Sequence, residues 1–503
     1  MAKYTHGILQ QYLLNEARKA WHYGYPPEKA FAAVTSVPAT LMGVGWRVGS
    51  LREGYDADVV VWDRNPFAPA AKPEHIFIDG IQAHATSAEP GFVTPSFGRT
   101  PHYPSTVKPL KSICTHVHTM QQVTFVNASK IYVNPGKGTV LNGSIVMRSG
   151  MVTCVGDCQP GGEIVDLKGG VVTPGLIGGA TRLGLSEISQ EDSTQDGNAP
   201  NDADADKFIN ARDGIRIGDS RVIKSAFRNG VTHAISVPMS RNSVLGVSTM
   251  IELGIDDISH GVVPRSVAFH YRVGHNSKMP SSPFSSISGQ IAELRHILMK
   301  QISMTNRGDI LHKVVRGEVP LAVEVNNSDD ILKVVGVKEL VEEHVHNMTG
   351  TRPVIKLVIV GGVEAWVVQH HLMDKGISVL LKPARCAPDQ WETRRCNVRS
   401  PELLASSGIP VALGISDMSF IRNFMFEATE VYHRGSNFVT PSDALAMVTS
   451  NVRDMFNTKV GGIIANGEAA FVVYDRDPIV DGLAAQVRAV ISGEKVECDP
   501  RQV

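Results

Sequence analysis

The stretch from Gly170 to Leu185 reads GVVTPGLIGGATRLGL, and the pattern of the whole chain changes at its proline, Pro174. Before Pro174, short β-branched and aromatic segments follow one another between Val123 and Val172, separated by Gly and Asn-Gly turns. Such a series is typical of a small antiparallel sandwich or barrel. After Pro174, apolar runs alternate with helical stretches. This stretch therefore marks the passage from one kind of β-structure to another.

The apolar runs after Pro174 have the composition of strands that are buried on both faces. They are residues 231–237, 320–325, 355–360, 377–381 and 409–414. Such strands are typical of parallel sheets covered by helices, and helices are expected between them, as at Ser288–Met299 and Ser328–Glu342. The interval 176–455, about 280 residues, suits a (β/α)8 barrel. We therefore predict an α/β protein, a (β/α)8 TIM-like barrel with a small β-sandwich composite domain built from segments on both sides of the barrel.

Two segments of 21 residues match each other without gaps. They are Arg47–Phe67, RVGSLREGYDADVVVWDRNPF, and Lys459–Ile479, KVGGIIANGEAAFVVYDRDPI. Shortly before them lie AFAAVTS, ending at Ser36, and ALAMVTS, ending at Ser450. A self-similarity at such a long period indicates a duplicated domain rather than a solenoid repeat.

These features resemble the amidohydrolase-related, metal-dependent hydrolase superfamily. In that family a run of the type P-G-L-I-D-x-H-x-H enters the barrel, and its two histidines hold a catalytic divalent ion. Here Pro174 begins the matching run, but Gly178 replaces the aspartate, and Ala180 and Arg182 replace the two histidines. Both repeat segments resemble the closing piece of the fold. The resemblance is to imidazolonepropionase-like enzymes and to fungal tandem amidohydrolases, sometimes labelled carbohydrate esterases, and it covers almost the whole chain.

The resemblance implies a division of the chain into four parts. Residues 1–85 are expected to be the C-terminal tail of a preceding amidohydrolase copy, and residues 86–120 a Pro-rich linker. Residues 121–175 and 456–503 are expected to form the β-sandwich composite domain around the amidohydrolase-like barrel of residues 176–455. The chain is accordingly expected to be a truncated part of a two-copy protein.

The family's later metal ligands are also missing. Where E-H-G is usual the chain has Val360, Gly361 and Gly362, and where G-T-D is usual Asp417 comes one place late. A shift of one residue sends a strand side chain to the opposite face. We therefore assign no metal site, and the vacated ligand positions are Ala180, Arg182 and Gly361. The candidate catalytic residue is Asp417, and the candidate substrate-binding residues are Arg182, Glu324 and Asn326.

Two of these positions suggest an ion pair. Arg182 follows the first barrel strand and Glu324 lies on a later one, so their side chains are expected to converge at the barrel mouth. We expect a direct Arg182–Glu324 ion pair, which would supply the positive charge that a metal would otherwise provide.

By family, the protein would be a hydrolase acting on carbon–nitrogen bonds other than peptide bonds. The lost ligands predict instead that this copy is a non-catalytic scaffold or regulatory copy, inactive alone and without a cofactor. Its partner would be an active amidohydrolase copy in the full-length protein, or a second copy in a homo-oligomer. The alternative is an active metal-dependent amidohydrolase or deacetylase-type hydrolase with an atypical site, which would need a divalent metal such as zinc. A third class is a small-molecule binding protein that uses the emptied barrel mouth.

The composition excludes few compartments but several partners. A net charge of −1 gives no electrostatic reason to expect nucleic acid or an anionic membrane. The longest apolar stretch, Leu357–Val368, is too short to cross a bilayer, and the N-terminus lacks the apolar core of a signal peptide. Because the natural N-terminus is expected to be missing, the localisation stays open.

Several metal-like spacings have simpler interpretations. Cys154 and Cys158 could form a disulfide or could face a strand and a turn, and a zinc site there would lack two further ligands. His116 and His118 lie in or beside the expected linker, far before the barrel entry. The acidic run that contains Asp202, Asp204 and Asp206 has no glycine at the position that a calcium loop requires and is expected to be an exposed loop.

Overall fold

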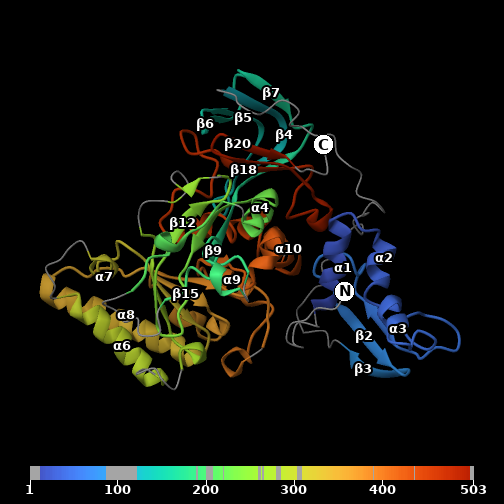
Figure 1. Ribbon diagram of the computed structural model, residues 1–503, viewed down its shortest axis with the longest axis horizontal. Helices are drawn as coiled ribbons and strands as arrows, with labels where there is room; N and C mark the ends of the chain where they lie inside the picture. Colours follow the sequence, from blue (N-terminus) through green and yellow to red (C-terminus); the bar gives the residue numbers. More distant parts are fainter. Residues whose placement is uncertain are drawn as a thin grey trace. The chain divides into compact units, whose positions relative to one another are not determined.

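Figure 1 shows the computed structural model of the chain. It describes residues 12–85, 122–188, 191–199, 208–218, 220–255, 257–258, 262, 266–278, 285–302, 309–388, 390–435 and 437–498. The chain divides into two compact units, Met1–Leu110 with Arg476–Gln486, and Lys111–Asp475 with Val487–Val503. The predicted linker 86–120, the His116–His118 pair and the acidic residues Asp202, Asp204 and Asp206 lie outside the described residues.

The first unit consists of three short helices followed by a three-stranded antiparallel sheet. These are α1 (Leu13–His22), α2 (Pro27–Ala32), α3 (Ser36–Leu41), β1 (Val59–Trp62), β2 (Pro73–Ile78) and β3 (Ile81–Ala85). Pro27 occupies the first turn of α2, where its missing N–H is not needed. The buried Trp21 ring packs edge-on against Phe67, with ring centroids 6.1 Å apart. Residues near the C-terminus complete this unit, since His22 Nδ1 lies 2.8 Å from the carbonyl oxygen of Leu483.

The second unit contains a large sheet whose strands come from both sides of its middle region (Figure 1). Its path runs β20-β19-β18-β8-β4-β5-β6, and β7 pairs with β4. β18 and β8 are antiparallel, with Val472 opposite Thr173, and Phe471 packs edge-on against Phe125 at 5.3 Å. Strands from residues 122–174 and 470–498 therefore share one core. Their bounds are β4 (Gln122–Asn134), β5 (Thr139–Arg148), β6 (Met151–Gly156), β7 (Glu163–Asp166), β8 (Val171–Pro174), β18 (Ala470–Tyr474), β19 (Val487–Ser492) and β20 (Lys495–Cys498).

The middle region is a mixed α/β structure with parallel strands, as predicted. One sheet has the order β11-β13-β14-β15-β16-β17 and is parallel from β13 to β17; a second has the order β12-β10-β9, with β9 and β10 parallel. Within the described residues these strands pair as two separate sheets, so the closure expected of a barrel is not present in their pairing. The bounds are β9 (Leu176–Thr181), β10 (Val231–Ser236), β11 (Val244–Val247), β12 (Thr249–Glu252), β13 (Phe269–Arg272), β14 (Leu321–Val325), β15 (Leu357–Gly361), β16 (Ile377–Leu381) and β17 (Val411–Leu413).

Helices alternate with the parallel strands. Both helices named from the sequence are confirmed as α6 (Ile287–Lys300) and α8 (Ser328–Thr349), although α8 continues beyond Glu342. The Asn327 side chain caps the start of α8, and Gly350 ends it in the left-handed conformation with φ of 72°. The other α-helices of this unit are α4 (Arg221–Arg228), α7 (Ile310–Val315), α9 (Ser400–Ser406), α10 (Phe424–Gly435), α11 (Pro441–Ala446) and α12 (Ser450–Met455).

The sequence repeat has a local structural counterpart. α1, α2, α3 and β1–β3 occur in the same order as α10, α11, α12 and β18–β20. The residue before α3, Thr35, has φ −130° and ψ −92°, and the residue before α12, Thr449, has φ −138° and ψ −97°. Gly49 and Gly461 both have positive φ, and a Cβ on either would meet the carbonyl oxygen of the corresponding threonine at 3.0 and 3.1 Å. The two segments therefore share backbone details that side-chain similarity alone does not impose.

The cysteines are paired, and one pairing was not foreseen. Cys154 and Cys158, left open by the sequence, form a disulfide, and Cys386 is bonded to Cys396.

Among the described helices, none combines the length and apolar character needed to cross a membrane.

Candidate functional site

Four charged side chains gather at the carboxyl ends of the parallel strands, and we call them the rim cluster. Arg182 follows β9, Arg272 ends β13, Glu324 is the next-to-last residue of β14, and Lys382 follows β16. Register explains the convergence of the last three. Arg272 is opposite Glu324 in the ladder, Glu324 is opposite Val360, and Val360 is opposite Leu380, two residues before Lys382. Side chains two apart on a strand share a face.

Hydrogen bonds hold three members of the cluster in place. Arg272 Nη2 donates to Glu324 Oε2 at 2.9 Å, and Arg272 Nη1 donates to the carbonyl oxygen of Ser240 at 2.8 Å. Lys382 Nζ donates to the carbonyl oxygen of Ala180 at 2.6 Å. Ala180 has φ of 50°, which is uncommon for a residue with a Cβ. Ala180, the first position predicted to have lost a metal ligand, thus offers a backbone oxygen that Lys382 already occupies.

The prediction of an ion pair between Arg182 and Glu324 is wrong. Glu324 forms its ion pair with Arg272, and Arg182 forms none with any described residue. The pairing follows from the ladder register, because Arg272 and Glu324 are direct neighbours on adjacent strands. Arg182 still affects Glu324 at longer range. Burial alone would raise the pKa of Glu324, but Arg272, Lys382 and Arg182 lower it below its usual value.

The rim cluster carries an excess of positive charge. Three cations accompany one carboxylate, a formal net charge of +2. Burial lowers the pKa of Lys382 to about 8. Attraction by Glu324 opposes this shift, and repulsion by Arg182 and Arg272 adds to it. The Arg182 side chain reaches solvent, but the protein around it and the charge of Arg272 lower its pKa. At pH 7 Lys382 therefore remains mainly protonated.

A buried histidine lies on the same face of β13 as Arg272. The His270 ring stacks on Phe456 with centroids 6.4 Å apart, and its Nε2 has no hydrogen-bond partner among the described residues. Burial, followed by the charge of Lys382, lowers the pKa of His270 to about 3. His270 is therefore neutral at pH 7 and adds no charge to the cluster.

Gly361, another position predicted to have lost a ligand, disfavours a side chain. Gly361 has φ of 90°, and a Cβ there would clash with Asn326 Oδ1. Asn326, a predicted substrate-binding residue, therefore has its amide oxygen against the empty position. That oxygen is buried and lacks a hydrogen-bond partner in the described part of the chain.

Asp417, the predicted catalytic residue, is not part of the rim cluster. It is exposed and caps the short helix η7 (Met418–Asn423), where its Oδ1 accepts a hydrogen bond from Ser419 N at 2.9 Å. No ion pair links it to the rim cluster within the described residues. A catalytic role for Asp417 stays a prediction.

The donor set of the rim does not fit the family's divalent metal. Ala180 and Gly361 have no ligand atoms in their side chains, and the protonated Arg182 and Lys382 have no lone pair to give. Two ligand groups remain, the neutral Nε2 of His270 and the carboxylate of Glu324, and the carboxylate is already bound to Arg272. A catalytic zinc site usually needs three protein ligands. We therefore derive no hydrolytic step through a metal at this rim.

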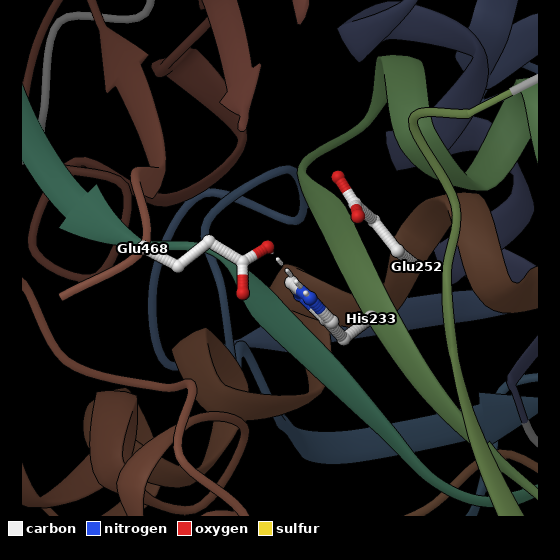
Figure 2. Close-up of side chains that lie close together, drawn as sticks. All are labelled: His233, Glu252 and Glu468. Atoms are coloured by element: carbon white, nitrogen blue, oxygen red, sulfur yellow. Dashed lines mark ion pairs between the residues drawn. The ribbon is translucent and has the colours of Figure 1, made fainter. Parts of the chain in front are cut away.

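Another group of side chains has ligand character but needs no ion. Figure 2 shows His233 of β10 facing Glu468, with Glu252 of β12 beside them, and potential ligand atoms of the three lie within 4.8 Å of one another. His233 Nε2 is 3.6 Å from Glu468 Oε1, and this contact lowers the pKa of Glu468. Glu252 Oε1 accepts a hydrogen bond from Ser492 Oγ at 2.7 Å. Each side chain thus has a protein partner. The sequence did not predict this group, because its members lie far apart along the chain.

Comparisons with known proteins identify proteins that are similar to this chain. The model of the amidohydrolase family matches residues 5–81. The amidohydrolase tasK of Hapsidospora irregularis is 27% identical over 512 residues, which covers 89% of this chain and 50% of that protein. The chain thus spans about half the length of the curated relative it matches. An amidohydrolase structure from Thermotoga maritima MSB8 is 22% identical with a TM-score of 0.63, and the match covers 74% of this chain and 99% of that one. The chain is thus similar in sequence to amidohydrolases, and its fold resembles that of a solved amidohydrolase.

Proposed function

We propose that this chain carries a non-catalytic copy of the amidohydrolase fold, acting as a scaffold or regulatory copy. The observation that supports the proposal is the rim cluster, in which Lys382 bonds to the carbonyl oxygen of Ala180 and Arg182 follows two residues later, both at positions predicted to have lost metal ligands. A divalent ion about 4 Å from one guanidinium would meet a repulsion of roughly 8 kcal/mol at an effective dielectric constant of 20. One carboxylate that is already paired cannot offset several such terms.

The architecture that we propose for this copy follows the family. The two parallel-strand sheets would be arcs of a TIM-like barrel within residues 176–455. The large sheet would be the β-sandwich composite domain of residues 121–175 and 456–503. The fold of the Thermotoga maritima amidohydrolase supports the barrel, because it matches 74% of this chain. The pairing of β18 with β8 supports the composite domain.

We further propose that residues 1–85 are the tail of a preceding copy. In the second unit, β18 is covered by β8 and β19, and Val472 and Val473 are 0% exposed. On the corresponding strand β1, which among the described strands pairs with β2 alone, Val60 and Val61 are 43% and 40% exposed. The body of a preceding, active amidohydrolase copy would cover these side chains as the second unit covers its own.

Metal analysis tests the loss of catalysis. The chain is purified without chelator, and zinc, iron and manganese are measured before and after addition of each ion. We expect less than one bound ion per ten chains at the rim. His233→Ala serves as the control, because it removes the other group with ligand character.

Two results would overturn this proposal. One is a nearly stoichiometric metal that survives His233→Ala and is lost in Glu324→Gln. The other is turnover of a cyclic amide or N-acyl substrate by the isolated chain that a chelator abolishes. Either result would favour the alternative, an active metal-dependent hydrolase with an atypical site.

The genomic sequence upstream tests the preceding copy. It should encode a second strand–proline–glycine entry followed by an intact D-x-H-x-H. Upstream sequence without such an entry would remove the basis for a two-copy protein and for the active partner.

A further inference from the structure

We propose that the rim cluster binds one small dianionic group, a phosphate or a dicarboxylate, with Arg182 as its principal donor. The inference rests on the proposed function, because it requires a rim without metal. It goes beyond that function by naming the class of ligand that the emptied rim would take.

Arg182 is the donor that the fold leaves free. Its side chain reaches solvent, and within the described residues it makes neither a hydrogen bond nor an ion pair. A guanidinium offers five N–H donors in a planar fork that matches two oxygens of a carboxylate or phosphate. Arg272 differs, since its Nη atoms are used by Glu324 and Ser240. Arg182 therefore forms the contact and Arg272 supplies charge.

The excess charge specifies the ligand. Arg182 and Arg272 lie close enough to lower the pKa of Lys382, and all three cations lower the pKa of Glu324. Their formal net charge together with Glu324 is +2. An anion of charge −2 would neutralise it. The Lys382 ammonium has three N–H donors and uses one on the carbonyl oxygen of Ala180. Its other donors remain for a ligand oxygen.

Unsatisfied polar atoms lie around the same cluster. Arg272 Nε and His270 Nε2 are buried and have no hydrogen-bond partner among the described residues. The charges of Lys382 and Glu324 both affect the pKa of His270, so its ring lies beside the cluster. Buried polar groups in proteins normally have a partner. A ligand or ordered water held by the cluster would supply it.

Glu324 is a positioning residue in this arrangement. Its hydrogen bond to Arg272 orients that guanidinium, and its negative charge offsets the repulsion among the three cations of the cluster. Because Glu324 repels an anion, its removal should tighten anion binding rather than weaken it.

Calorimetric titration of the whole chain tests the inference. Inorganic phosphate and succinate are titrated separately in chloride buffer with EDTA at pH 7.0 and constant ionic strength. We expect one site, and loss of one charge-assisted contact in Arg182→Gln or Lys382→Met should weaken binding about tenfold or more. The matched control is Arg216→Gln, whose exposed guanidinium pairs with Asp196 outside the cluster. It should bind like the unaltered chain.

The outcomes separate the possibilities. Stronger binding of phosphate assigns a phosphate-bearing ligand, and stronger binding of succinate assigns a dicarboxylate. No binding of either anion, or binding that Arg182→Gln and Lys382→Met leave unchanged, would overturn the inference while the metal-free rim stands. Anion binding that appears only with zinc and disappears with EDTA would instead overturn the proposed function.

Discussion

Glu324→Gln is the substitution that most directly tests the electrostatics of the rim. It removes the single carboxylate of the cluster while nearly preserving shape, and it raises the formal net charge from +2 to +3. Arg272 loses an ion pair whose side chains are 12% and 29% exposed. Loss of one partner costs roughly 3–5 kcal/mol in a fully buried pair and about 1 kcal/mol or less at the surface. This partly buried pair should therefore destabilise the fold by about 2 kcal/mol.

Urea unfolding, followed by circular dichroism, measures this effect. The expected shift appears in chloride buffer at pH 7 and shrinks in sulfate, because a bound dianion replaces the missing negative charge. Glu339→Gln is the matched control, since it breaks the Lys375 ion pair in which the side chains are 37% and 42% exposed. It should change stability by less than about 1 kcal/mol. An equal effect of the two substitutions, or a Glu324→Gln effect that sulfate does not reduce beyond the control, would refute the reasoning.

Three further predictions concern other features of the second unit. Gly361→Ala should destabilise it by about 1–3 kcal/mol in urea unfolding, because its φ of 90° and the Asn326 oxygen 2.4 Å from a new Cβ both oppose a side chain. Sulfate affinity should fall as pH rises through about 8, since Lys382 loses its proton there, and Lys382→Met should remove this pH dependence in calorimetry. Replacing Cys386 and Cys396 by serine opens a loop with a sequence separation of 10. In thermal unfolding, that change should lower the free energy of unfolding by roughly 2–3 kcal/mol.

The sequence by itself determined much of the fold. The apolar runs from 320–325 to 409–414 became β14 to β17, because parallel strands buried on both faces need apolar side chains at nearly every position. The repeat also predicted shared local structure, which the matching turns at Thr35 and Thr449 bear out. The absence of side-chain ligand atoms at Ala180 and Gly361 follows directly from the sequence.

Only the tertiary structure decided which charges meet at the rim. Arg182 and Glu324 were candidate site residues from the sequence. Arg272 and Lys382 lie in no motif, and the ladder register and the strand ends bring them to the rim. The partner of Glu324 is a neighbour across the sheet, a relation that separation along the chain does not encode. The Cys386–Cys396 disulfide and the His233–Glu468 contact have the same origin. Side-chain type and period are local properties of a sequence, whereas proximity between distant residues arises only when strands pair.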